Sequence, residues 1–145
     1  NLKKIATDPS VPGVIFDGFP RTIDQAKQLD NLLTNLNLSL TNILYFDISR
    51  EDSIKRISGR QIDSRNNHVY HIESNPAPKD CEPFLIQRDD DTPEKVSHRY
   101  NIFMEQTKPL LTYYGSQVVE INSLQSINDI QHSIDSILNI NSAIR

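Results

Sequence analysis

The chain has 145 residues, of which 37% are hydrophobic and 23% charged, and its formal net charge is −4. This length suits one domain with one buried core, and this composition is typical of a globular protein rather than a disordered one. The sequence holds no long basic run and no apolar stretch of about 20 residues, so neither a nucleic-acid surface nor a membrane-spanning helix is predicted. Its one cysteine, Cys81, forms no internal disulfide and favours a reducing compartment.

The N-terminus does not resemble a translation start, because the chain begins with Asn1 and its only methionine is Met104. The first ten residues also lack the apolar core of a signal peptide. We therefore expect a fragment, or a product from which an N-terminal part was removed.

The first half of the chain alternates between strand and helix patterns. Residues 14–16 and 42–48 are apolar runs that do not alternate with polar residues, which predicts two strands buried on both faces. Apolar residues at helical spacing predict an amphipathic helix over residues 23–35. Ser49 with Asp52 resembles a capping box, so we expect a helix over residues 50–58 that stops at Gly59.

Residues 60–91 differ, because they hold three of the eight prolines and no long periodic apolar pattern. They predict an inserted loop or a small β element. Thr92 and Pro93 then predict a helix start, and we expect Pro109 to kink or restart that helix. Residues 117–121 predict a third strand, and residues 126–138 a last helix whose isoleucine stripe packs in the core. This alternation predicts an α/β domain with a parallel sheet.

The segment from Asp17 to Arg21 is the first candidate site. Ligands of open α/β sheets bind beyond the carboxyl ends of the strands, and Asp17 directly follows the first predicted strand. Gly18 permits a sharp turn, and Arg21 precedes the next predicted helix, whose N-terminus favours anions. The segment therefore predicts a place where Mg²⁺-bound water and phosphate meet. The alternative is a simple turn, because Asp-Gly is also a common hairpin signal.

Four further arginines lie at or near the ends of predicted elements: Arg56, Arg60, Arg88 and Arg99. Arg56 and Arg60 are four residues apart and are expected on one face of a helix end. In a net acidic chain these arginines suggest a clamp for a small polyanion, because phosphoryl transfer depends on positioned positive charge. Taken singly, each is explained equally well as an exposed surface side chain.

Acidic and aromatic residues around the insertion have competing interpretations. We expect Asp89 to be solvated, and Asp90 and Asp91 to pair with arginines. Tyr70 and His71 are candidates to line a nucleotide-base pocket. His68, His71 and Cys81 make a poor zinc set, because the sequence has no CxxC pair.

The motifs DGFPRT with Gln25, SGR, VYH and QRDDD occur in this order, and with them the sequence resembles the adenylate kinases over essentially its whole length. The resemblance implies the α/β, three-layer α/β/α fold of the nucleoside-monophosphate kinases, which is P-loop NTPase-like and has a parallel sheet, here incomplete, with a small lid insertion. It divides the chain into core parts at 1–59 and 92–145 and a lid at 60–91. The glycine-rich phosphate loop and the first AMP-binding segment of the family are absent from this sequence.

The implied activity is reversible transfer of the terminal phosphoryl group of ATP to AMP, which gives two ADP and requires Mg²⁺. The implied protein is a cytoplasmic monomer, with a mitochondrial location as the alternative, and has no nucleic-acid partner, no membrane partner and no structural zinc. Without the phosphate loop, we expect this chain alone to have impaired activity.

The resemblance also implies roles for individual residues. Those implied to bind AMP are Gly18, Arg21, Gln25, Arg88 and Arg99. Those implied to bind ATP are Arg56, Arg60, Tyr70 and His71. Those implied to act in the phosphoryl transfer are Asp17, Arg56, Arg60, Arg88 and Arg99. Asp17 would act on Mg²⁺ through a bound water, no residue would bind the metal directly, and Asp90 and Asp91 would order the arginines.

Two other functions stay open. One is a non-catalytic module that binds AMP or another nucleotide. The other is a kinase of different specificity, either GTP:AMP or UMP/CMP. The long insertion argues against UMP/CMP, and the VYH and QRDDD pieces favour ATP over GTP.

Overall fold

The structure, a computed structural model, describes residue 10 and residues 13–138. The chain divides into two compact units, one formed by Asn1–Asp47 with Phe103–Arg145 and the other by Ile48–Ile102. Each unit has its own sheet, a parallel one in the first and an antiparallel one in the second.

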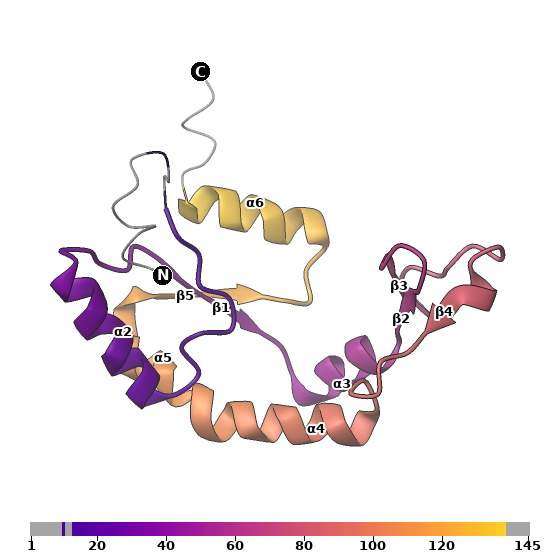
Figure 1. Ribbon diagram of the computed structural model, residues 1–145, viewed down its shortest axis with the longest axis horizontal. Coiled ribbons are helices and arrows are strands. Elements are labelled where there is room, and N and C mark those ends of the chain that lie inside the picture. The colour runs from indigo at the N-terminus through magenta and orange to yellow at the C-terminus, as the bar shows by residue number, and fades with distance from the viewer. Residues whose placement is uncertain (1–9, 11–12, 139–145) are drawn as a thin grey trace. The chain divides into compact units, whose positions relative to one another are not determined.

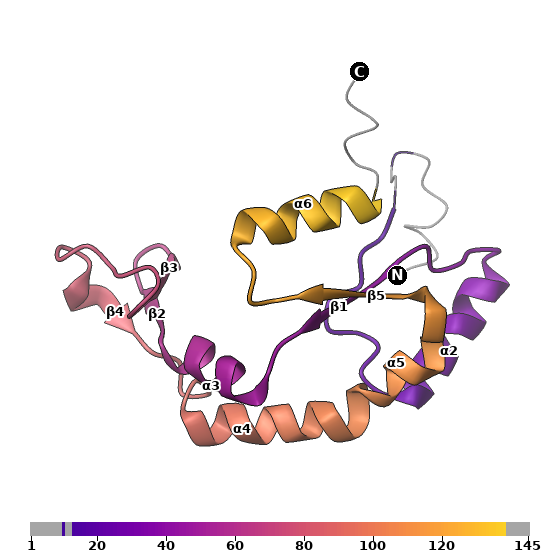
Figure 2. The same cartoon turned by 180° about the vertical axis from the view of Figure 1, so that it is seen from behind.

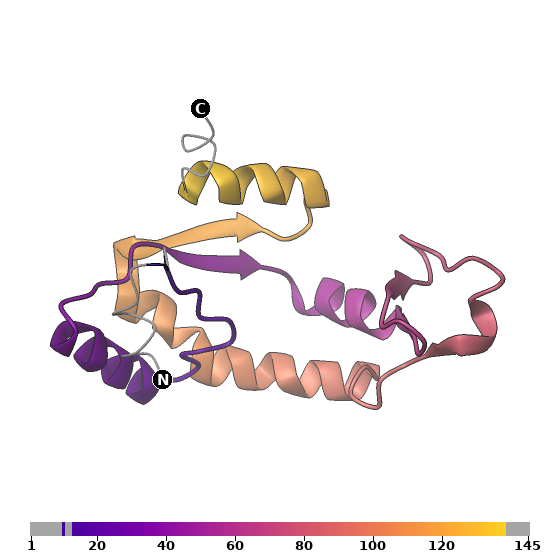
Figure 3. The same ribbon diagram turned by 45° about the horizontal axis from the view of Figure 1, so that its top comes forward.

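The sheet of the first unit pairs β1 (Ile43–Asp47) in parallel with β5 (Val118–Asn122). Both strands and their parallel pairing confirm the sequence prediction. Figure 1 shows the strands nearly edge-on, with α6 (Ile127–Leu138) on one side and α2 (Ile23–Asn35) and α5 (Pro109–Tyr114) on the other. The same layers are seen from behind in Figure 2, and Figure 3 shows the two strands side by side. The unit is therefore an α/β sandwich, as expected.

The strand predicted at residues 14–16 is wrong. Residues 13–16 form no strand, and the side chains of Val14 and Ile15 are exposed, Ile15 by 89%. A strand needs a hydrogen-bonded neighbour, and the described part of the chain places none beside this segment. An apolar run indicates that a segment tends to be buried, but a strand also needs a neighbouring strand, which the run itself does not reveal.

Helix α2 confirms the prediction for residues 23–35. Thr22 caps it, because its Oγ1 accepts a hydrogen bond from Gln25 N at 3.3 Å. Its apolar stripe is buried at Ala26, Leu29 and Leu33. The second half of the helix is tied to α5 by the hydroxyl of Tyr113, which donates to Asp30 at 2.8 Å.

The last helix is present but its stripe is not core, which corrects the prediction. No residue of α6 is fully buried, and Ile127 is 85% exposed. The middle of the stripe is half-buried, at Ile130, Ile134 and Ile137. The described sheet beneath α6 has only two strands, which is too narrow to cover the whole stripe.

The second unit contains α3 (Arg50–Ser58), α4 (Pro93–Ile102) and a small antiparallel sheet in the order β3 (Val69–His71), β2 (Arg60–Asp63), β4 (Leu85–Ile86). The sheet confirms a small β element within residues 60–91. The Arg50 guanidinium donates to the Ser97 hydroxyl and so joins α3 to α4.

Helix α4 begins at Pro93, and Lys95 N donates to Thr92 Oγ1 at 3.4 Å, which confirms the predicted start. A π-helical segment, Phe103–Thr107, follows it. Helix α5 then begins at Pro109, which is the restart that this proline predicted.

Gly59 ends α3 as predicted, in the right-handed helical region. Its φ is −86°, so it does not use the left-handed region that favours glycine at helix ends. A Cβ at this position would lie 2.4 Å from Nε2 of His71. The residue must therefore be small because the imidazole of β3 lies directly over its backbone.

Candidate functional site

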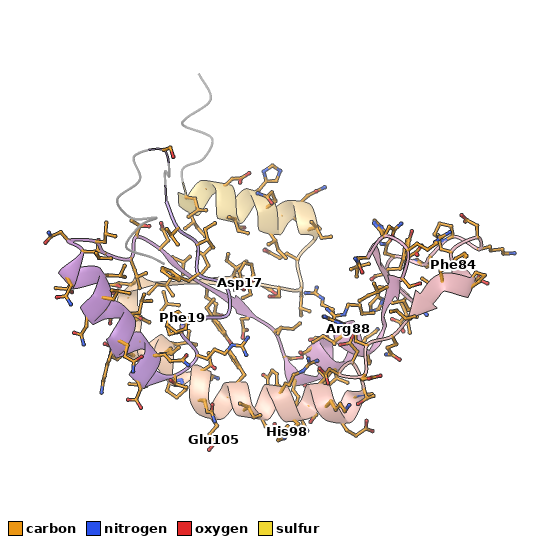
Figure 4. The ribbon with its side chains drawn as sticks, in the orientation of Figure 1. Asp17, Phe19, Phe84, Arg88, His98 and Glu105 are labelled. Carbon is orange, nitrogen blue, oxygen red and sulfur yellow. The ribbon has the colours of Figure 1, made fainter. Side chains whose placement is uncertain are left out.

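The loop before α2 places Arg21 through its own backbone. Arg21 Nε donates to the carbonyl oxygen of Gly18 at 2.8 Å. Gly18 has a φ of +68°, and a Cβ there would lie 3.0 Å from Arg21 Nη2. Glycine thus serves twice, for the left-handed turn and for the close approach of the guanidinium. The Phe19–Pro20 peptide bond is cis. Asp17 and Phe19 are labelled on this loop in Figure 4.

Two further hydrogen bonds fix the loop to its unit. Arg21 N donates to Gln25 Oε1 at 2.8 Å, and Thr107 Oγ1 donates to Arg21 O at 2.9 Å. The Gln25 amide is therefore oriented with its oxygen toward the loop and its Nε2 left as a donor. The sequence did not single out Thr107 for this role, because its partner lies 86 residues away.

Asp17 does not pair with Arg21. The carboxylate is exposed, and no described residue forms a hydrogen bond or ion pair with it. A carboxylate of this kind can accept hydrogen bonds from metal-bound water, which fits an indirect role with Mg²⁺. Within the described ranges, no three His, Cys, Asp or Glu side chains are grouped to hold a metal ion.

The second unit gathers arginines around one buried carboxylate, that of Asp91. Arg60 donates two hydrogen bonds to it, from Nε at 2.9 Å and from Nη2 at 2.8 Å. Arg99 Nη2 lies 3.8 Å from the same carboxylate and donates to the carbonyl oxygen of Asp90 at 2.9 Å. The Arg60 hydrogen bonds lower the pKa of Asp91, and the charges of Arg60, Arg99 and Arg88 add to this effect. Asp91 is therefore a charged anchor for the arginines, as expected.

The other predicted arginines also lie in this unit, on separate elements. Arg88 is exposed in the segment between β4 and α4 and is labelled in Figure 4. Arg56 is exposed on α3. The expectation that Arg56 and Arg60 share a helix face is wrong, because α3 ends at Ser58 and Arg60 belongs to β2.

The two neighbouring aspartates differ from Asp91. The Asp90 carboxylate lies 3.9 Å from Lys95 Nζ, so only its backbone carbonyl contacts an arginine, which corrects the expected pairing. Asp89 is exposed, and its carbonyl oxygen accepts from Lys95 Nζ at 2.8 Å.

The side chains of Tyr70 and His71 both form contacts within the second unit. The Tyr70 hydroxyl lies 3.8 Å from Cys81 Sγ, and this contact together with burial raises the pKa of Tyr70. The His71 Nδ1 accepts from the backbone amides of Glu73 and Ser74 at 3.1 and 3.2 Å. Its Nε2 faces Lys55 O at 3.4 Å. Their polar atoms hold the β element together, and their implied role toward ATP stays a prediction.

A polar cluster in the β element was missed by sequence reasoning. Asp63 is fully buried, and its carboxylate accepts hydrogen bonds from both Nε and Nη2 of Arg65, the latter at 2.6 Å. Arg65 Nη2 also lies 3.4 Å from Cys81 Sγ, and the guanidinium stacks 4.0 Å over the Phe84 ring. No motif marks this cluster, because its members come from two separate stretches of the sequence, residues 63–65 and 81–84.

The predicted site residues thus form two groups. The AMP-side residues of the first unit share one loop and the start of α2: Asp17, Gly18, Arg21 and Gln25. The second unit holds the remaining predicted residues: Arg56, Arg60, Tyr70, His71, Arg88 and Arg99. Within the second unit, Arg60 and Arg99 are brought together on Asp91.

Comparison with known proteins gives one consistent result. The family model described as adenylate kinase matches residues 2–119. Adenylate kinases of Oceanobacillus iheyensis and Listeria innocua are 38% and 36% identical over 143 residues, covering 94% of this chain. That of Thermosipho africanus is 38% identical over 136 residues, covering 88% of this chain. The chain spans 66% of the length of the first two relatives and 62% of the third. The family match extends over most of the sequence, and the chain therefore belongs to the adenylate kinase family.

Proposed function

We propose that the protein catalyses reversible phosphoryl transfer from ATP to AMP, which yields two ADP, with Mg²⁺ supplied alongside the nucleotide. The observation that carries this proposal is the set of arginines around Asp91. Three arginines act on one buried carboxylate, so this carboxylate alone does not neutralise their charge. A surplus of fixed positive charge suits the transferring group, whose charge spreads over its oxygens in the transition state.

The loop of Arg21 supports binding of the acceptor. Its Nη groups have no partner in the described part of the chain, and they lie at the N-terminus of α2, where a phosphate is favoured. Gln25 offers its Nε2 as a donor to a base, while its oxygen is held by Arg21 N. We infer that this loop binds AMP by its phosphate and its base.

In the proposed reaction, an oxygen of the AMP phosphate forms a bond to the γ-phosphorus of ATP. The bond from that phosphorus to the oxygen bridging the β- and γ-phosphates breaks, and ADP leaves with the electron pair. Arg60, Arg88 and Arg99 stabilise the charge on the transferring group. Mg²⁺, when bound with the nucleotide, would supply charge neutralisation on the phosphates, and the exposed carboxylate of Asp17 would hold its water.

The setting of the protein is part of the proposal. No helix in the described ranges is long and apolar enough to cross a membrane. The relatives reported above are bacterial proteins and give no support to a mitochondrial location. We propose a cytoplasmic monomer that acts on free nucleotides and binds no nucleic acid.

The test follows the phosphorus signals of ATP, AMP and ADP in solution by ³¹P NMR. The chain without substitutions, called the parent chain below, should form ADP only when ATP and AMP are both present. Arg88→Lys should reduce the rate at least tenfold, because lysine cannot reproduce a planar two-pronged contact with a phosphoryl group. Lys27→Arg, on the exposed face of α2, is the control. Binding of AMP without any ADP formation would favour the non-catalytic module instead.

A further inference from the structure

Two segments connect the small sheet of the second unit to its helices. Residues 58–60 lead from α3 into β2, and residues 87–91 lead from β4 toward α4. The Gln87 side chain joins these segments, because its Nε2 donates to the carbonyl oxygen of Ser58 at 2.7 Å. This hydrogen bond stands one residue before Arg88 and two residues before Arg60 in their respective segments.

The bond has a structural reason on the helix side. The last carbonyl groups of a helix have no partner within it, and Ser58 is the last residue of α3. Gln87 satisfies this carbonyl from outside the helix. A short bond to an otherwise unpaired acceptor gives the 87–91 segment a fixed attachment point on α3.

The contacts close into a ring that contains both arginines. From Ser58 the backbone runs to Arg60, whose guanidinium binds the Asp91 carboxylate. Asp91 N donates to the carbonyl oxygen of Arg88 at 3.0 Å, which closes a tight turn. Arg88 is bonded to Gln87, and Gln87 returns to Ser58. Two links of this ring are made by side chains, the Arg60–Asp91 pair and the Gln87 bond. Without the Gln87 bond, the turn that carries Arg88 would still be attached through Asp91 and through the pairing of Ile86 with Ile62, but it would have no direct link to the end of α3.

We propose that Gln87 is a positioning residue for Arg88. It holds the turn that carries Arg88 against the end of α3, so that Arg60 and Arg88 keep a fixed spacing around Asp91. This inference rests on the proposed function, in which Arg88 contacts the transferring group. Gln87 itself touches no reacting atom in this scheme, and its effect reaches the reaction only through the arginine beside it.

The variants separate the hydrogen bond from the bulk of the side chain. Gln87→Met keeps an unbranched chain of similar length and removes the donor. Gln87→Lys restores an N–H donor to the Ser58 carbonyl. Gln28→Met is the matched control, since Gln28 is exposed on α2 in the other unit. Each chain is measured for ADP formation and for amide hydrogen exchange at Asp91, whose N–H closes the turn.

We expect Gln87→Met to lower kcat roughly threefold to tenfold, the factor of one neutral hydrogen bond, with a smaller change in KM for ATP. Exchange of the Asp91 amide should accelerate in the same variant. Gln87→Lys should recover both properties, and Gln28→Met should change neither. Faster exchange with an unchanged kcat would overturn the proposal, because Gln87 would then stabilise the turn without positioning Arg88. An unchanged exchange rate in Gln87→Met would overturn it as well.

A readout independent of turnover covers the case in which the parent forms no ADP. Arg88 contributes to the low pKa of Asp91, so displacement of Arg88 should raise that pKa. Titration of the Asp91 carboxyl by ¹³C NMR should therefore give a higher pKa in Gln87→Met than in the parent and in Gln28→Met. An absent turnover would count against the proposed function alone. An unchanged pKa of Asp91 would contradict the positioning role itself.

Discussion

Arg60 binds Asp91 with two hydrogen bonds that join β2 to the segment before α4, across 31 residues of sequence. The side chain of Asp91 is 1% exposed and that of Arg60 is 30% exposed. A paired geometry of this kind fixes the plane of the guanidinium as well as its distance. The remaining nitrogen of Arg60 therefore has a defined direction, which is what a phosphate-binding side chain requires.

Asp91→Asn should lower the free energy of unfolding of the second unit by about 2 kcal/mol, because it removes the charge from two charge-assisted hydrogen bonds. Urea unfolding of both chains at neutral pH measures the difference. The matched control is Glu73→Gln, which breaks the exposed pair of Lys55 and Glu73 at 2.9 Å and should cost much less, because solvent screens an exposed pair. Equal losses in the two variants would show that burial of Asp91 adds nothing.

Gly59→Ala should destabilise the contact between α3 and the small sheet. The new Cβ would lie 2.4 Å from Nε2 of His71, so the imidazole must move, at a cost of about 1 to 3 kcal/mol. Thermal unfolding measures this loss. Gly13→Ala is the control, since nothing lies within 4 Å of a Cβ there. Adding His71→Ala to Gly59→Ala should recover part of the loss, and strictly additive effects would show that the two residues do not interact.

The helices and the parallel strands were predictable because their signals are local. Thr22 before a periodic apolar pattern is enough to start α2, and Pro109 is enough to restart α5. The strand at residues 14–16 failed for a non-local reason, since pairing depends on a neighbour that a local pattern cannot supply. The close contact between Gly59 and His71 could not be predicted for the same reason, because His71 is twelve positions further along the chain.

The buried carboxylate of Asp63 predicts that the small antiparallel sheet is sensitive to acid. Hydrogen bonds from Arg65 lower the pKa of Asp63 from 3.8 to about 2. Because the folded-state pKa is depressed, the stability from this group is fully present above the ordinary value and is lost as the pH falls toward 2. NMR titration of the Asp63 carboxyl and urea unfolding between about pH 5 and about pH 2 test this. Asp63→Asn should lower stability near pH 5 and flatten its dependence below that, and a variant with the parent's slope would contradict the assignment.

The loop of Arg21 predicts selective binding of AMP. Arg21→Lys should weaken AMP binding roughly tenfold, because lysine loses the guanidinium fork at the start of α2. Gln25→Glu removes the Nε2 donor and should weaken AMP more than ribose 5-phosphate, which lacks a base. Calorimetry measures both affinities, and Lys27→Arg serves as control. If Gln25→Glu weakened both ligands equally, its effect would come from the Arg21 loop and not from the base.

The sequence was enough to predict which residues form the candidate site, but only some of the contacts between them. Asp17, Arg21 and Gln25 lie within nine residues, so one loop places them together. Arg60 and Asp91 are 31 residues apart, and Arg60 lies in an antiparallel sheet. The strands of this sheet could not be located from the sequence, because residues 60–91 contain three prolines and no long periodic apolar pattern. The roles of Thr107 and of Gln87, the first residue of the QRDDD motif, could not be predicted, since each acts by a single hydrogen bond to a distant backbone carbonyl.

The most direct measurement gives the chain ADP and Mg²⁺ alone and follows all phosphorus species by ³¹P NMR. Phosphoryl transfer between two ADP molecules produces ATP and AMP in equal amounts and releases no inorganic phosphate. The parent chain should show this pattern, and Asp91→Asn should form both products more slowly and still in equal amounts. Unchanged ADP, or AMP and inorganic phosphate without ATP, would contradict the assignment of phosphoryl transfer to this protein.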